Sequence, residues 1–288
     1  MMHSHSTILV VGAAGKFAGL VVPELAKRGA KIRGLITHEN QRDVVRRNGA
    51  SEIVVGDLTD RVSINAALKG IDSVFYIAPA FLPHEAEIGV AMVDAVKKAD
   101  VRRIVFSSVI HPSLSQLSNH SAKAPVEEAI VSSGLEYSCL QPALFFQNFA
   151  SAWPKVIEGG VIAEPWAIET RFSRVDYRDV AEVAAIALTE DRLLYGTFEL
   201  CSQDILDRND VAKLMGEVLG REIKAAKINL PLSGDTSQSA DDPQAAMRHM
   251  MEWYDTHGLL GNSLPLHAIL GREPRRLKTY FEELHHGK

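Results

Sequence analysis

The sequence has few of the features that mark disulfide-stapled, nucleic-acid-binding or membrane proteins. It contains two cysteines in 288 residues, and Cys139 and Cys201 lie far apart, outside any metal or redox spacing. The formal net charge of −5 is spread without long runs of one sign, which argues against a nucleic-acid or membrane-surface partner. No segment approaches transmembrane length, and the first residues lack a secretory pattern. We therefore expect a cytoplasmic protein with buried free thiols that acts on a small molecule.

What the chain does contain is a regular alternation of strand-like and helix-like segments. Its hydrophobic share of 46% and charged share of 23% suit one large domain with a subordinate C-terminal part. The predicted strands are 7–11, 32–36, 53–55, 74–78, 104–106 and 137–140, and the predicted helices between them lie near 18–28, 41–47, 64–68, 88–99 and 126–131. Strands this apolar, each separated by one helix, predict an α/β fold with a doubly wound parallel sheet of the Rossmann type.

The alternation loosens beyond Pro142, where tryptophan, proline and glycine gather. A helix over 177–188 and a strand over 197–200 are expected to return to the sheet, and further helical patterns follow to the C-terminus. We predict a Rossmann core over residues 1–150 and a small, mostly helical substrate-binding region over 151–288.

Glycines mark the turn between the first strand and the first helix. Gly12, Gly15 and Ala18 have the spacing G-x-x-G-x-x-A, with residues of little or no side chain where backbone must approach a pyrophosphate. The motif follows a buried strand and opens a helix, which is the context that a dinucleotide site requires. A phosphate-binding Walker loop does not fit, because Lys16 is followed by Phe17 and not by serine or threonine.

The residues after the second and third strands bear on which dinucleotide binds. A carboxylate that selects NAD is expected at the end of the second strand, but Thr37 and His38 stand there. Lys16 and Arg42 could bring positive charge to a 2′-phosphate, which favours NADP, with NAD as the alternative. Asp57, after the third strand, is either an acceptor for the adenine amino group or the N-cap of the next helix.

Four stretches together resemble the NmrA-like branch of the atypical short-chain dehydrogenases/reductases. They are residues 12–19, the sequence Val-Gly-Asp-Leu at 55–58, the sequence Phe-Ser-Ser-Val-Ile-His-Pro at 106–112, and residues 119–148 with their Gly-Leu-Glu-Tyr at 134–137. The resemblance covers most of the chain. It implies a Rossmann sheet that binds NAD(P) across its strand ends and a small C-terminal substrate region.

The resemblance also assigns roles to individual residues. It places Ser107 against the nicotinamide and Lys123 at the position of the lysine that holds the nicotinamide ribose. The tyrosine that donates the proton in most relatives should stand four residues before that lysine, where this chain has Asn119, so His120 and His111 are the candidate proton donors. The predicted cofactor contacts are Gly12, Gly15, Lys16, Phe17, Thr37, His38, Asp57, Leu58, Ala78, Pro79, Lys123, Pro142 and Phe145, and no metal ligands are predicted.

Several of these residues also have simpler interpretations. Lys123 could be a surface residue paired with Glu127 one helical turn later, and either histidine could be structural. The residues from Pro142 to Phe146, with Trp153 and Trp166, could line a pocket for a flat, poorly charged substrate or could be ordinary core.

Two functions remain in view. The first is an NAD(P)H-dependent oxidoreductase that transfers hydride to a small apolar acceptor, a quinone or a carbonyl. The second is a non-catalytic NAD(P) sensor of the NmrA type that binds a regulatory protein partner, which the absence of the tyrosine favours; a homodimer is compatible with either. We favour the enzyme, and an isomerase or lyase on the same fold is a third alternative.

Overall fold

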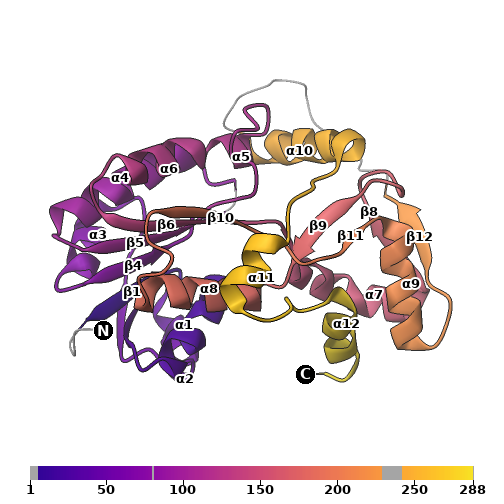
Figure 1. The fold of residues 1–288 in the computed structure, drawn as a ribbon, viewed down its shortest axis with the longest axis horizontal. Helices are drawn as coiled ribbons and strands as arrows, with labels where there is room; N and C mark the ends of the chain where they lie inside the picture. The colour runs from indigo at the N-terminus through magenta and orange to yellow at the C-terminus, as the bar shows by residue number, and fades with distance from the viewer. Residues whose placement is uncertain (1–5, 80, 229–241, 288) are drawn as a thin grey trace. The chain divides into compact units, whose positions relative to one another are not determined.

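The aliphatic and β-branched runs form one seven-stranded sheet in the computed structural model of the chain, which describes residues 6–79, 81–228 and 242–287. The strand order is β10-β6-β5-β4-β1-β2-β3 (Figure 1). These strands are β1 (Thr7–Val11), β2 (Lys31–Ile36), β3 (Glu52–Val55), β4 (Ser73–Tyr76), β5 (Arg103–Ser107), β6 (Glu136–Pro142) and β10 (Gly196–Leu200). The pairings from β3 through β1 to β6 are all parallel. The direction of winding reverses between β1 and β4, which is where such sheets bind ligands.

Helices cover both faces of this sheet, as a sheet that is apolar on both faces requires. Figure 1 shows α3, α4 and α6 on one face and α1, α2 and α8 on the other. Their bounds are α1 (Ala18–Lys27), α2 (Arg42–Arg47) after the short 3-10 helix η1 (Glu39–Gln41), α3 (Arg61–Leu68), α4 (Glu85–Lys98), α6 (Ala124–Val131) and α8 (Tyr177–Thr189). The predicted doubly wound parallel sheet is therefore confirmed.

The chain divides into two compact units. The first comprises residues 1–116, 120–141 and 180–198, and the second comprises 117–119, 142–179 and 199–288. The helix and strand predicted to return to the sheet, α8 and β10, lie largely in the first unit. Residues 142–150 lie in the second unit, and the assignment of residues up to 150 to cofactor binding stays a prediction.

The second unit combines helices with two small sheets that the sequence pattern did not predict. Its helices are η2 (Phe146–Ser151), α7 (Trp153–Gly159), α9 (Arg208–Leu219), α10 (Pro243–His257), α11 (Leu264–Leu270) and α12 (Leu277–His285). One sheet joins β7 (Leu144–Phe145), β9 (Phe172–Val175) and β11 (Ile205–Leu206), and the other joins β8 (Val161–Glu164) and β12 (Lys224–Lys227). Strands of two to four residues are too short to show a period in the sequence.

Both cysteines are buried free thiols, as predicted. Cys139 lies on β6 and Cys201 follows β10, and burial raises the pKa of each thiol to about 12. Within the described ranges, none of the helices is both long and apolar enough to cross a membrane.

Close contact between α4 and α6 depends on a glycine. Gly89 on α4 faces Val126 on α6, and a Cβ atom added at Gly89 would lie 2.4 Å from Val126 Cγ2. Val126 is itself buried and belongs to the core cluster on this face of the sheet. The two helices can therefore approach this closely only because residue 89 has no side chain.

We expect Gly89→Ala to destabilise the protein by about 1–3 kcal/mol, because the added methyl group overpacks the α4–α6 contact. The measurement is the free energy of unfolding from urea titration. Gly159→Ala is the matched control, since Gly159 is also helical and a Cβ there meets no atom within 4 Å. Equal stabilities of the two variants would contradict the proposed contact.

Candidate functional site

The loops that follow the parallel strands of the first unit meet at one edge of the sheet. Parallel strands share their carboxyl ends, so the segments after β1, β2, β3, β4 and β5 gather there. The predicted contacts of the first unit lie in these segments, except Lys123, which lies at the start of α6. Most are exposed or half-buried, and Ser107 and Lys123 are buried.

The glycine turn after β1 has the backbone that a bound pyrophosphate needs. Gly12 has φ +68°, a left-handed conformation that residues with side chains rarely adopt. The N–H of Gly15 donates to the carbonyl of Gly12 at 2.7 Å, and a Cβ at Gly15 would lie 3.0 Å from that same oxygen. Both glycines are exposed, while Ala18 is buried at the start of α1. This turn therefore offers bare backbone next to a helix N-terminus, which fits an anionic group.

Lys16 and Phe17 complete this turn. The Lys16 ammonium lies 5.5 Å from the centre of the Phe17 ring, and partial burial lowers the pKa of Lys16. Lys16 thus places a positive charge beside the exposed glycines.

The loop after β2 is organised by Gln41, not by a carboxylate. The Gln41 Oε1 accepts from the backbone N–H groups of Thr37 and His38, both at 3.1 Å. Arg42, expected to meet a 2′-phosphate, instead pairs with Glu39 and donates to the carbonyl of Ile53 at 3.0 Å. The charge of Arg42 is therefore compensated within the loop.

Asp57 follows β3 and is not a helix cap. Its carboxylate accepts from the N–H and the hydroxyl of Thr59, both at 2.8 Å, and these bonds lower the pKa of Asp57. The N-cap of α3 is Asp60, whose side chain accepts from the backbone of Val62 and Ser63. The alternative in which Asp57 caps the helix was wrong, because the N-cap residue of α3 is Asp60.

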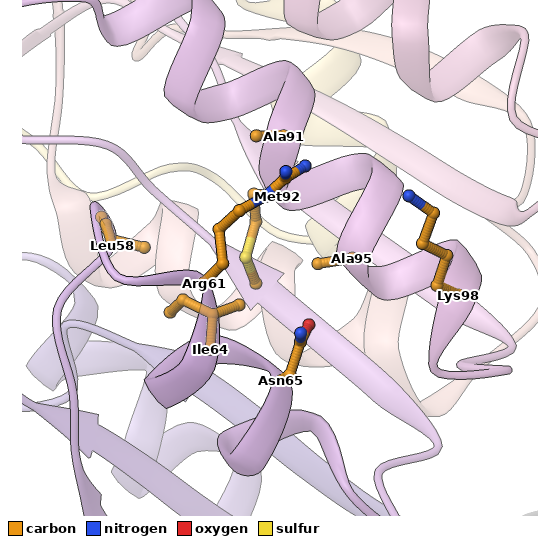
Figure 2. A pocket seen from close by; sticks show the side chains of 8 residues that line it. All are labelled: Leu58, Arg61, Ile64, Asn65, Ala91, Met92, Ala95 and Lys98. Atoms are coloured by element: carbon orange, nitrogen blue, oxygen red, sulfur yellow. The ribbon is translucent and has the colours of Figure 1, made fainter.

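Leu58 borders a pocket of about 230 Å³ between α3 and α4 (Figure 2). The walls on the two helices are Ile64, Ala91, Met92 and Ala95, with Arg61, Asn65 and Lys98 as polar members. This volume is below the range of pockets that enclose a drug-sized ligand, so the pocket can receive one ring system at most.

The segment after β5 is held to the neighbouring strand β6 by a backbone hydrogen bond. Ser107 is the last residue of β5 and is buried, and the N–H of Ser108 donates to the carbonyl of Leu140 at 2.8 Å. The Ser108 hydroxyl is buried and has no hydrogen-bond partner among the described residues. This hydroxyl is a polar group at the sheet edge that the sequence did not single out.

Lys123 is buried, and its partner is an acid that the sequence did not indicate. The ammonium forms an ion pair with Glu85, whose side chain is 4% exposed while that of Lys123 is 9% exposed. Burial raises the pKa of Glu85, and the positive charge of Lys123 opposes that effect. The alternative pairing of Lys123 with Glu127 was wrong, because Glu127 accepts from the Gln141 amide at 2.9 Å.

His120 lies in the core of the first unit. Its side chain is fully buried, and its Nδ1 lies 2.8 Å from the carbonyl oxygen of Ile110, so Nδ1–H is the donor. Burial lowers the pKa of His120 to about 4. The ring is therefore neutral at pH 7 and fastens the 107–111 loop, and this placement favours the structural alternative for the histidine over proton donation.

Asn119 lies in the second unit, on the short helix α5 (Ser118–Ser121). Its Nδ2 lies 3.2 Å from Met250 Sδ on α10, and its side chain also hydrogen-bonds with Tyr254. Burial raises the pKa of Tyr254, so that phenol stays protonated. An amide engaged with α10 orients its neighbours but supplies no proton.

The aromatic residues after β6 divide between the surface and the core of the second unit. Pro142 is buried, and Phe145 is half-buried with its ring 4.9 Å from that of Tyr177 in an edge contact. Trp153 stacks on Phe281 in the core of this unit. Trp166 packs against Phe172 and Tyr254. The two tryptophans are therefore core residues of the second unit.

The residues of the first unit fit a dinucleotide. The exposed glycine turn suits the pyrophosphate, and Leu58, Ala78 and Pro79 leave partly accessible surfaces after neighbouring strands. The buried Lys123 side chain belongs to the N-cap residue of α6. Lys123 is the residue with the chemistry to hold ribose hydroxyls.

Sequence reasoning missed Glu85 and Tyr76. Glu85 lies before the predicted start of its helix, and its burial depends on a partner 38 residues away. Tyr76 was assigned to a strand only, yet its hydroxyl is buried and has no hydrogen-bond partner within the described part of the chain. A signal for Glu85 existed, since an acidic residue three residues before an apolar helical pattern is a first-turn position.

The chain is similar in sequence and in fold to several known proteins. The model of the NmrA-like family matches residues 4–285. An NAD(P)H azoreductase of Xenophilus azovorans is 26% identical over 248 residues, which are 86% of each chain. The NADPH-dependent quinone oxidoreductase of Escherichia coli, solved with NADPH, has a TM-score of 0.81 at 19% identity and covers 96% of this chain and 99% of its own. The triphenylmethane reductase of Citrobacter sp., solved with NADP(H), has a TM-score of 0.82 at 20% identity, with 98% and 100% covered.

The buried neutral His120 predicts a specific dependence of stability on pH. The ordinary pKa of histidine is 6.5, so between pH 6.5 and about 4 the unfolded chain binds a proton that the folded ring does not. Neutral His120 therefore makes its full contribution to the free energy of unfolding above pH 6.5, and this contribution is lost as the pH falls from 6.5 through about 4. We expect the unfolding free energy of the wild type to fall more than that of His120→Asn across this window, by on the order of 3 kcal/mol.

His111→Asn is the control for this measurement. His111 is partly exposed and has φ +54°, a conformation that asparagine tolerates. The unfolding free energy of the His111→Asn variant should depend on pH as steeply as that of the wild type. A wild-type profile parallel to that of His120→Asn would contradict the assignment of a buried neutral ring.

Proposed function

The chain belongs to the NmrA-like family, and on that premise we propose that it is an NADPH-dependent reductase that transfers hydride to a small apolar quinone. The observation that carries the proposal is the buried Lys123 ammonium in the same unit as the exposed glycine turn. A buried charge is costly, and a functional use accounts for its retention.

Different residues would contact different parts of the cofactor. Gly12 and Gly15 would receive the pyrophosphate, and Lys16 the 2′-phosphate. Asp57 and Leu58 would contact the adenine, with Thr37, His38, Ala78 and Pro79 beside the adenosine. Lys123 would bind the nicotinamide ribose, and Ser107 would border the nicotinamide. The bound cofactor supplies the hydride, while the protein supplies orientation and exclusion of water.

The proton requirement favours a quinone over a simple carbonyl. Hydride addition to a ketone yields a strongly basic alkoxide that needs a nearby acid, and neither the amide of Asn119 nor the neutral His120 provides one. Hydride addition to a quinone yields a stabilised hydroquinone anion, which water can protonate. The lack of an acid at these positions is therefore compatible with quinone reduction.

The comparisons support this acceptor class. The similar proteins are an NAD(P)H azoreductase, a quinone oxidoreductase solved with NADPH and a triphenylmethane reductase solved with NADP(H). A location in the cytoplasm is part of the same proposal, because two buried thiols suit a reducing compartment.

We expect the purified protein to bind NADPH and to oxidise it when a quinone is added, followed by the fall in absorbance near 340 nm. The panel should contain benzoquinones, naphthoquinones, aldehydes and ketones, with quinones the fastest. Tight NADPH binding without oxidation by any member would support the regulatory alternative, in which the protein reports cofactor state to a partner. Failure to bind either NADPH or NADH would refute the proposal altogether.

A comparison of NADPH and NADH affinities tests the role of Lys16. We expect Lys16→Ala to weaken NADPH binding by about 5- to 20-fold, because one charged contact to the 2′-phosphate is lost. NADH affinity, measured by calorimetry on the same variant, should change little and serves as the internal control. An equal loss for both cofactors would assign Lys16 to the pyrophosphate instead.

A further inference from the structure

We infer that Glu85 is the positioning residue for Lys123, holding its ammonium where the cofactor ribose is bound. The inference rests on the proposed function and adds a residue that the family resemblance did not supply. The ion pair joins the first residue of α4 to the N-cap residue of α6.

Helix packing fixes the geometry of this pair. Gly89 lies one turn after Glu85, and Val126 lies in the first turn after Lys123. The close contact between Gly89 and Val126 holds these two helix starts together. The Lys123 stem, which would otherwise sample many rotamers, is therefore held at both its backbone and its ammonium.

Two further residues, Tyr76 and His120, interact electrostatically with this pair. Tyr76, from β4, interacts electrostatically with Glu85, and burial together with that negative charge raises the pKa of Tyr76. His120 interacts with Lys123 and His111 and is neutral at pH 7. Both neighbours are therefore uncharged at pH 7 beside the Lys123–Glu85 ion pair.

Stability alone does not account for the pair. Buried ion pairs are often no more stabilising than apolar side chains of the same volume. An ammonium has three N–H donors, so a bond to Glu85 does not exhaust its capacity to donate to ribose hydroxyls. Glu85 thus allows a buried lysine to stay charged and correctly directed.

The test compares Glu85→Gln with Glu87→Gln. Glu87 is exposed in the same first turn of α4, so its substitution removes the same charge near the same helix end without touching Lys123. We expect Glu85→Gln to weaken NADPH binding at least 10-fold at pH 7. The deficit should grow towards pH 9, because a buried ammonium without its counter-charge loses its proton more readily. Glu87→Gln should match the wild type, and Glu85→Asp should recover most of the affinity.

A second readout needs no cofactor. Acylation of Lys123 by an amine-directed reagent at pH 8, followed by mass spectrometry of the intact fold, reports the fraction of neutral amine. We expect a several-fold faster reaction in Glu85→Gln than in the wild type or Glu87→Gln. If Glu85→Gln fails to fold, the double variant Glu85→Gln with Lys123→Gln restores a neutral hydrogen-bonded pair, and it should fold and bind NADPH as poorly as Lys123→Met.

The outcomes separate this inference from the proposed function. A wild type that does not bind NADPH overturns both. Normal NADPH affinity and acylation rate in Glu85→Gln, alongside weak binding in Lys123→Met, overturn only the role of Glu85. A lower melting temperature with an unchanged pH profile would make Glu85 a purely structural residue and would likewise overturn the inference.

Discussion

The constraint on which the site depends is the shared direction of the strands from β1 to β6. Parallel pairing places the carboxyl ends of strands β1 to β6 at one edge of the sheet, so the loops that follow these strands gather there although they are distant in sequence. The glycine turn can then leave its backbone exposed, because the rigid sheet behind it holds the turn in place. The helices that follow the loops begin at this edge too, and the Lys123–Glu85 pair is a consequence of where α4 and α6 begin.

Local patterns were sufficient to predict the sheet and the glycine turn. The turn at Gly12 and Gly15 needs a backbone without side chains, so glycine at these positions predicts it. The alternation of apolar runs with helical periods predicts the order of strands and helices along the chain. These are properties of neighbouring residues. The small sheets around β8 and β9 were beyond reach, because their strands are too short to show a period and depend on tertiary contacts.

The chemistry of single residues was harder to predict than their location. The resemblance placed Lys123, but it did not indicate the partner of its ammonium. Helical spacing suggested Glu127, whereas the actual partner, Glu85, is brought close by the packing of α4 against α6. His120 has a useful pKa in water, and only its burial shows that it is neutral in the fold. The sequence likewise suggested that Arg42 could bind a phosphate, but in the fold its guanidinium forms an ion pair with Glu39.

The two buried cysteines have a further consequence under the proposed reduction of quinones. Quinones are electrophiles that alkylate thiolates, and an enzyme with a reactive thiol would be inactivated by its own substrate. Cys139 and Cys201 are the only cysteines of the chain, and with pKa values of about 12 and no exposed sulfur they offer almost no thiolate. Burial of these side chains in the packed fold would thereby also protect the protein from alkylation by the proposed substrate.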